Sequence, residues 1–135
     1  MLFRSKLIYA RLTGWGQTGA FASMAGHDIN YVALSGALSL IRRKGDRPLP
    51  PVNLVGDFAG GALFCAMGIL LALVERNCSG KGQVIDAAMV DGAANLTAMF
   101  HGMLSHNLMT LDIGTNSLDS GAPFYQTYEI GRAHV

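Results

Sequence analysis

The stretch that decides the fold is DFAGGALFCAMGILLALVER, residues 57–76. Its central part, residues 58–74, contains no charged side chain and is bounded by Asp57 on one side and by Glu75 and Arg76 on the other. A helix that is apolar on every side is normally buried. The sequence therefore predicts a long buried helix with Asp57 at its start.

A membrane-spanning helix is the alternative interpretation of residues 58–74. A bilayer crossing needs about 20 predominantly apolar residues, whereas this run is shorter and contains Gly60, Gly61 and Gly68. Small side chains recur in it at four-residue spacing, and this spacing allows a second helix to approach closely. We therefore expect no membrane span, and we expect the helix to lie at an extensive protein interface.

The flanking sequence predicts an α/β chain. Short apolar or aromatic runs next to turn residues favour strands over residues 7–12, 83–87 and 123–129, the first of them buried. Two further helices are expected, one from about Gly26 and one over residues 89–104, and Gly80 is placed to end the central helix. Strands that alternate with helices indicate the α/β class.

Composition limits the function classes. Half of the 135 residues are hydrophobic and 14% are charged, compared with about 25% in an average domain. Such a chain is expected either to bury much of its surface against another chain or domain, or to be part of a larger protein. The net charge of +1, with 10 scattered Lys and Arg residues, argues against nucleic-acid binding. The two cysteines form no CxxC pair, which argues against a zinc site. Two cysteines in a chain of this size do not make a disulfide framework, which indicates a reducing compartment.

Four stretches carry the candidate chemistry. They are RLTGWGQTG at residues 11–19, GHDINY at 26–31, NLVGDFAGG at 53–61 and GKGQVIDAAMVDG at 80–92. Their order and spacing resemble those of the α-methylacyl-CoA racemases, a branch of the class III CoA-transferase superfamily, from about Lys6 to Glu129. The resemblance implies the α/β class III CoA-transferase fold, in which a two-domain subunit interlocks with its twin. This chain would be a fragment of such a dimer.

Racemisation next to a thioester carbonyl requires one acid/base group on each face of the reacting carbon. Histidine suits one face because its unperturbed pKa is about 6.5, and a carboxylate suits the other if its surroundings raise its pKa. By resemblance, His27 and Asp57 hold these two catalytic positions. The developing enolate oxygen also needs hydrogen-bond donors, such as backbone amides at the start of a helix.

The GHDINY stretch contacts the CoA thioester in the family, so its residues are the substrate-binding candidates: Gly26, His27, Asp28, Ile29, Asn30 and Tyr31. We expect the Asp28 side chain itself to be structural, in the first turn of a helix. Neither a metal nor a separate cofactor is expected, because coenzyme A is part of the substrate. Without the matched flanks, His27 would be interpreted as a core or cap residue and Asp57 as a helix N-cap.

Two other functions remain as alternatives. In a CoA-transferase of this superfamily, the aspartate at the position of Asp57 attacks a thioester and becomes a covalent acyl carrier. Transferases usually have an aromatic residue before the aspartate of the GHDINY motif and a glutamine at the position of Tyr31, so His27 and Tyr31 favour the racemase. The third possibility is an inactive fragment that only packs or dimerises.

The resemblance also implies a division of the chain. Residues 1–121 form part of the large domain, residues 122–130 begin the small domain or a linker, and residues 131–135 are a non-native end. The nucleotide-binding segment that opens the family's proteins, and a later helper glutamate, have no counterpart in this sequence. We therefore expect the isolated chain to be inactive.

The expected partners are an acyl-CoA substrate, in branched-chain fatty acid or bile acid metabolism, and a second copy of the complete protein in a homodimer. The start, MLFRSKLIYARL, does not have the pattern of a secretory signal. We expect an intracellular location, in mitochondria and peroxisomes for a eukaryotic protein and in the cytoplasm for a bacterial one.

Overall fold

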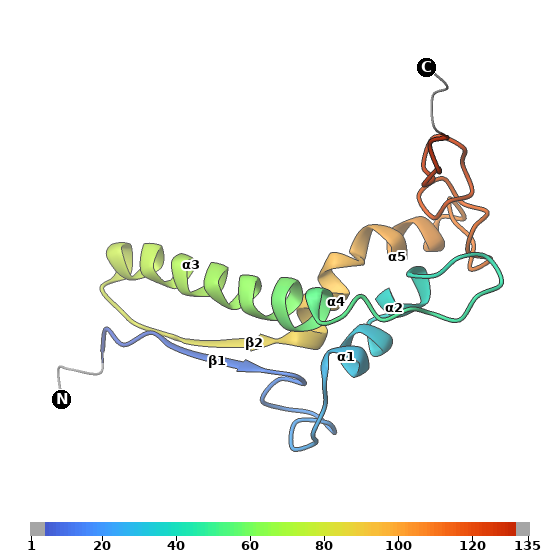
Figure 1. Ribbon diagram of the computed structural model, residues 1–135. Coiled ribbons are helices and arrows are strands. Elements are labelled where there is room, and N and C mark those ends of the chain that lie inside the picture. Colours follow the sequence, from blue (N-terminus) through green and yellow to red (C-terminus); the bar gives the residue numbers. More distant parts are fainter. Residues whose placement is uncertain (1–4, 132–135) are drawn as a thin grey trace.

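The computed structural model describes residues 5–131 of the chain. Two strands, β1 (Tyr9–Thr13) and β2 (Val84–Ala88), pair in parallel. Parallel neighbours need a crossover connection, and here the crossover contains the long helix α3 (Phe64–Ser79), which lies along the sheet (Figure 1). The α/β class and the first two predicted strands are confirmed.

Shorter helical segments surround this unit. Within the described residues they are α1 (Asp28–Leu34), α2 (Ala37–Leu40), η1 (Leu54–Leu63), α4 (Met89–Leu96) and α5 (Ala98–Ser105). In Figure 1, α1 and α4 lie near the carboxyl ends of the two strands, where η1 also meets them. The N-terminal ends of α1, η1 and α4 therefore lie at one end of the sheet.

The predicted central helix is present, but it begins earlier and winds differently than expected. Its first part, η1, is a π-helix, and the Phe58 N–H bonds to the Asn53 carbonyl oxygen at 3.3 Å. π-Helices are rare and often occur at functional sites. The following helix α3 ends at Gly80, whose φ is +72° and whose N–H bonds to the Arg76 carbonyl oxygen at 2.8 Å. The predicted glycine cap is confirmed.

The helices η1 and α4 pack against each other through bare backbone. A Cβ on Gly92 would lie 1.8 Å from the carbonyl oxygen of Gly60, and a Cβ on Gly60 would lie 2.6 Å from the Ala93 nitrogen. Both positions therefore require glycine, because any side chain would overlap the other helix. The close helix approach predicted from small residues is confirmed, with Gly60 and Gly92 at the contact.

The predicted helix over residues 89–104 is divided at Thr97 into α4 and α5. The Thr97 hydroxyl lies 3.0 Å from the Ala94 carbonyl oxygen and 3.5 Å from that of Ser35. Threonine hydroxyls that bond to the preceding turn are known to bend helices. His101 Nε2 bonds to the Ser35 carbonyl oxygen at 3.0 Å, so the bend is anchored to the end of α1.

One side of the helix formed by η1 and α3 is covered, and the other is exposed. The buried residues are small: Gly56, Gly60, Gly61, Cys65 and Ala72. The large apolar residues on the exposed side are 49–66% exposed: Leu63, Met67, Leu70, Leu71 and Val74. Within the described residues of this chain the helix is buried on one face, which the sheet and α4 cover, and not on every side. The predicted interface on its other face stays a prediction.

The sheet is similarly one-sided. Tyr9 lies opposite Val84 in the register, and their side chains are 51% and 63% exposed. The predicted burial of the first strand is wrong within the described residues, because α3 lies on one face of a sheet that has two strands.

The helical stretch Leu54–Ser79 is long and apolar enough to cross a membrane when length and composition alone are considered. Its most apolar window has a mean hydropathy of 2.0, and 17% of that window is buried. Core helices of soluble proteins meet the same criteria, so this feature is weak evidence. The expectation of no membrane span stays a prediction.

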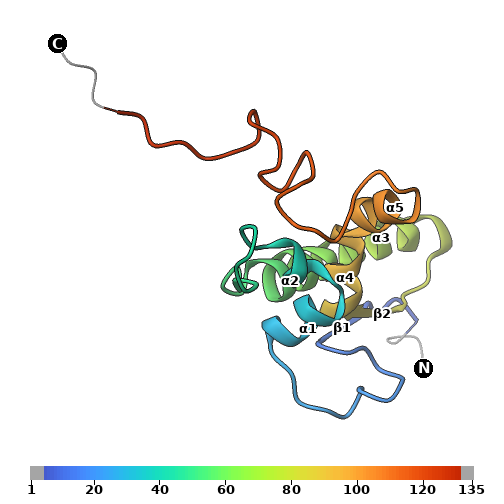
Figure 2. The same ribbon diagram turned by 90° about the vertical axis from the view of Figure 1, so that its right-hand side faces the viewer.

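The C-terminal segment, residues 106–131, contains neither helix nor strand. Met109 and Ile113 near its start are buried, and its last part projects away from the helices (Figure 2). The predicted strand over residues 123–129 is wrong, because no described strand lies beside it to pair with, and Phe124 and Tyr128 are exposed. The predicted domain boundary after residue 121 stays a prediction. Of the end predicted to be non-native, residues 132–135 lie outside the described range.

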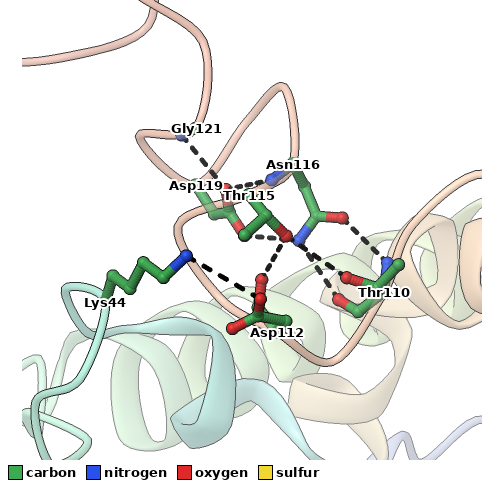
Figure 3. Close-up of polar contacts among 7 residues, drawn as sticks. All are labelled: Lys44, Thr110, Asp112, Thr115, Asn116, Asp119 and Gly121. Carbon is green, nitrogen blue, oxygen red and sulfur yellow. Dashed lines mark hydrogen bonds and ion pairs between the residues drawn. The ribbon is translucent and has the colours of Figure 1, made fainter.

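Local polar contacts shape this segment (Figure 3). The Asp119 carboxylate accepts bonds from the Asn116 backbone N–H (2.8 Å) and from Asn116 Nδ2 (2.5 Å), and Asn116 Oδ1 accepts one from the Thr110 N–H (2.8 Å). Burial acts to raise the pKa of Asp119, but hydrogen bonds from Asn116 and nearby backbone groups outweigh burial and lower it. Lys44 and Asp112, 3.9 Å apart, are both well exposed, so this ion pair contributes little.

Candidate active site

His27 stands immediately before α1. Its backbone is extended, with φ −135° and ψ 168°, and it occupies the N-cap position of the helix. Its N–H donates to Asn30 Oδ1 at 2.9 Å, so the Asn30 side chain turns back to close the helix start. The His27 side chain is exposed. The residue therefore has a fixed backbone and an accessible imidazole, which a proton-transfer group needs.

Asp57 is the fourth residue of η1 and is partly buried. The N-cap of η1 is Asn53, so the interpretation of Asp57 as a helix N-cap is wrong. Its position near the start of the helical segment agrees with the sequence prediction. Its backbone, rather than its side chain, makes the contact that fixes the segment.

That contact comes from Asp28. Its Oδ1 accepts hydrogen bonds from the Gly56 N–H at 2.7 Å and from the Asp57 N–H at 2.8 Å. The side chain is 6% exposed, and its Oδ2 is buried with no hydrogen-bond partner among residues 5–131. The Gly56 and Asp57 amides are therefore occupied, and these two amides do not provide the enolate donors expected at this helix start.

Tyr31 lies beneath the same region and is 5% exposed. Its ring meets Trp15 edge-on, with the centroids 4.7 Å apart and the planes at 82°. A Cβ on Gly14 would lie 2.2 Å from the Tyr31 hydroxyl oxygen, and one on Gly26 would lie 2.8 Å from both the Tyr31 ring and Trp15 Nε1. The two glycines thus allow the aromatic pair to pack against the backbone.

The environment keeps the Tyr31 phenol protonated. Burial raises its pKa above the ordinary value of 10.0, and the negative charges of Asp57 and Asp28 raise it further. Tyr31 is therefore a neutral hydrogen-bond donor at physiological pH.

The four sequence motifs meet in this region. Tyr31 of the second motif packs on Trp15 of the first, and Asp28 bonds to the Asp57 amide in the third. The fourth motif joins through the Gly92 contact with Gly60 and through the Val90 N–H, which donates to the Gly14 carbonyl oxygen at 3.1 Å. His27 and Asp57 are thus connected through Asp28, and their assignment as the two catalytic groups stays a prediction.

The remaining binding candidates lie on the outer side of α1. Ile29 is 45% exposed and Asn30 is exposed, while Gly26 is partly buried against the aromatic pair. Their assignment to CoA binding stays a prediction. Next to them is a largely apolar cavity of about 490 Å³, lined by Trp15, Phe21, Met24, Ala25, Asn30, Ala33 and Leu34.

Sequence reasoning missed the hydrogen bonds of Asp28 to the third motif. The two bonds join residues that are separated by 28 and 29 positions in the sequence. No local pattern indicates a contact over such a separation. His101 and His106 bond to backbone carbonyl oxygens, at 3.0 Å each. Within residues 5–131, no cluster of three or more His, Cys, Asp or Glu side chains could hold a metal ion.

Comparisons with known proteins agree with the motif assignment. The chain is 56% identical to α-methylacyl-CoA racemase of Mus musculus over 124 residues, which are 92% of this chain and 32% of that protein. It is also 56% identical to α-methylacyl-CoA racemase of Homo sapiens, over 91% of this chain and 32% of that protein. The chain therefore spans about a third of the length of these relatives.

A solved structure shares the fold. The crystal structure of a CaiB/BaiF family protein from Brucella suis superposes with a TM-score of 0.67 at 31% identity, over 76% of this chain and 27% of that one. The sequence pattern of the family described as CoA-transferase family III matches residues 3–135. The predicted resemblance and fold class are confirmed, and the chain belongs to CoA-transferase family III.

Proposed function

We propose that the protein containing this chain epimerises 2-methylacyl-CoA thioesters at C2 by two-base proton transfer. The observation that carries this proposal is the connection of His27 to Asp57 through the buried Asp28 carboxylate. The 56% identity to two α-methylacyl-CoA racemases supports the same reaction. An accessible imidazole and a partly buried carboxylate in one neighbourhood are the two groups that such a reaction needs.

In this mechanism one group removes the C2 proton and the other returns a proton to the opposite face. His27 acts on one face and Asp57 on the other. Because Asp28 occupies the Gly56 and Asp57 amides, the enolate oxygen must receive its hydrogen bonds from other groups. Coenzyme A enters as part of the substrate, and we propose no separate cofactor.

The apolar cavity beside α1 suits the hydrocarbon part of such a substrate. Its volume, about 490 Å³, falls within the usual range of ligand pockets. Its lining is largely apolar, and it adjoins the stretch assigned to CoA binding. We therefore propose that the acyl chain lies along Trp15, Phe21 and Met24.

The test uses the complete protein and a 2-methylacyl-CoA in deuterated water. We expect deuterium at C2, and His27→Ala should lower the rate of conversion between the two C2 epimers by about 100-fold or more. The matched control is His106→Ala, because His106 is exposed at the end of α5 and bonds only locally. Epimerisation that survives in His27→Ala, or is lost equally in His106→Ala, would contradict the assigned role.

A CoA-transferase is the second candidate, because Asp57 would also serve as its acyl carrier. The same experiment separates the two functions. Transfer of CoA to a free carboxylate without deuterium at C2 would support the transferase. Absence of both reactions from the complete protein would support a role in packing alone. We expect the isolated 135-residue chain to be inactive in both assays.

We also propose that the complete protein is a homodimer. The support is the exposed apolar side of η1 and α3, where Leu63 and Leu70 are 66% and 63% exposed. Sedimentation of the complete protein should show a dimer that Leu70→Asp dissociates. The control is Leu111→Asp, in the exposed C-terminal segment. If Leu70→Asp unfolds the protein without a folded monomer, this face lies inside one subunit and the dimer contact is elsewhere.

We propose an intracellular location that follows from the substrate. Acyl-CoA thioesters of branched fatty acids would be met in mitochondria and peroxisomes of a eukaryote, or in the cytoplasm of a bacterium. Microscopy or fractionation of the complete tagged protein tests this proposal.

A further inference from the structure

Asp28 differs from every other charged residue in the described chain. Among residues 5–131 it is the one acidic or basic side chain in the buried class, at 6% exposure. A buried carboxylate is costly unless hydrogen bonds compensate it. Its Oδ1 receives two, from the consecutive amides of Gly56 and Asp57. The two bonds therefore point to a built contact between the second and third motifs.

We propose that Asp28 is a positioning residue for the proton-transfer site, whose carboxylate fixes Asp57 relative to His27 by holding the two backbone N–H groups at the start of η1. On one side the link is covalent, because Asp28 directly follows His27. On the other side it consists of the bonds of 2.7 Å and 2.8 Å. The inference rests on the racemase function proposed above.

The winding of η1 explains why these two amides need an acceptor. In this π-helix the Phe58 N–H bonds to the carbonyl oxygen of Asn53, five residues earlier. Gly56 and Asp57 precede Phe58, so their N–H groups belong to the initial turn, which lacks acceptors within the helix. Asp28 supplies that acceptor from another element, and its negative charge suits the positive end of the helix dipole.

The space around the contact is equally specific. A Cβ on Gly56 would lie 2.6 Å from Asp28 Oδ1 and 3.2 Å from the Asp28 carbonyl oxygen. A side chain at position 56 would therefore push the two segments apart. Glycine at this position allows the backbone of α1 to approach that of η1, and the proximity of His27 and Asp57 depends on this approach.

Proton transfer is sensitive to such displacements. A shift of about 1 Å in a reacting group can lower the rate about 100-fold. Loss of the Asp28 carboxylate should therefore lower kcat, because Asp57 is no longer held. It should leave KM within about threefold, because a positioning group does not contribute to substrate binding. A substrate-binding role for the side chain would raise KM instead.

The experiment compares four variants of the complete protein. Asp28→Ala removes the acceptor, whereas Asp28→Asn keeps an oxygen that can accept both amides. Gly56→Ala strains the same contact from the other side. The control is Asp86→Asn, because Asp86 Oδ2 also accepts a backbone N–H across the fold, from Gln17 at 3.2 Å, but has no link to His27 or Asp57.

We expect Asp28→Ala and Gly56→Ala to lower kcat by about 100-fold, Asp28→Asn to retain at least about a tenth of the wild-type kcat, and Asp86→Asn to be unchanged. Amide hydrogen exchange over residues 54–63 should accelerate in Asp28→Ala and remain slow in Asp28→Asn. If Asp28→Ala does not fold, the Asp28→Asn and Gly56→Ala pair decides the outcome.

A kcat equal to that of the wild type in Asp28→Ala or in Gly56→Ala would overturn the proposal. A higher KM with an unchanged kcat would overturn it as well. A loss in Asp28→Asn as large as that in Asp28→Ala would also overturn it, because charge rather than the amide contact would then matter. Failure of the racemase function is distinguishable, since the wild-type protein would then show no deuterium at C2. The amide-exchange comparison would still report whether Asp28 holds η1.

Discussion

The segment from β1 to α4 and the C-terminal segment, residues 106–131, are held in different ways. In the first, the contacts join residues far apart in the sequence, such as Asp28 with Asp57 and Gly60 with Gly92. In the second, hydrogen bonds join residues that are one to six positions apart, as between Thr110, Asn116 and Asp119 (Figure 3). The segment from β1 to α4 should therefore unfold in one cooperative step. The hydrogen bonds of residues 106–131 should instead break one at a time.

The largest effect is expected at the crossing of η1 and α4. Gly92→Ala in the complete protein should lower the free energy of unfolding by about 3 kcal/mol, because its Cβ would lie 1.8 Å from the Gly60 carbonyl oxygen. Urea unfolding measures the change. Gly102→Ala in α5 is the control, since no atom lies within 4 Å of its Cβ. It should stabilise the protein by up to about 1 kcal/mol, and equal effects of both changes would contradict the contact.

A smaller effect is expected at the bend between α4 and α5. Thr97→Val keeps the shape of the side chain but removes the hydroxyl that bonds to the Ala94 carbonyl oxygen at 3.0 Å. The loss should be about 1 kcal/mol in urea unfolding. Thr127→Val in the exposed C-terminal segment should change nothing measurable. A more stable Thr97→Val protein would mean that the hydroxyl strains the bend instead of holding it.

The third prediction concerns the Tyr31 phenol. Because its folded-state pKa is raised, its contribution to stability is fully present below pH 10 and is lost as pH rises through the folded-state pKa. The tyrosinate absorbance of Tyr31 is the difference between the wild type and Tyr31→Phe. It should therefore develop at a pH above the ordinary pKa of 10.0. Asp57→Asn should lower this midpoint, because the Asp57 charge is one of its causes. An unchanged midpoint would mean that Asp57 lies too far away to act.

The smallest effect is expected in the C-terminal segment. The folded-state pKa of Asp119 is lowered, so its contribution is present above the unfolded-state pKa, about 3.9, and is lost as pH falls through the folded-state value. Limited proteolysis of residues 110–121 should accelerate in that acidic range. Asp119→Asn should show the faster cleavage already at neutral pH, without a change in global unfolding. A drop in global stability would contradict the separation of the two regions.

The sequence predicted the features that depend on local patterns. Strand β2, the glycine cap at Gly80 and the motif positions of His27 and Asp57 follow from short stretches. The exposed side of α3 was not predictable, because burial depends on what packs against a helix. The bond from Asp28 to the Asp57 amide was also missed, since it joins residues 29 positions apart.

The predicted strand over residues 123–129 shows the limit of pattern alone. Alternating aromatic residues have the period of a strand, but a strand also needs a partner with matching hydrogen bonds. The π-winding of η1 had no signal in the sequence, because apolar residues and glycines are equally compatible with an α-helix. In both cases neighbouring segments, rather than local preference, decide the conformation.

The direct continuation of η1 into α3 has an evolutionary consequence for chain length. An α-helix turns about 100° for each residue, so the deletion of one residue after Asp57, such as Ala59, would rotate this carboxylate about the helix axis relative to α3. The same deletion within residues 122–130 would merely shorten an exposed connection. Insertions and deletions should therefore be excluded between Asp57 and Phe64 but tolerated within residues 122–130.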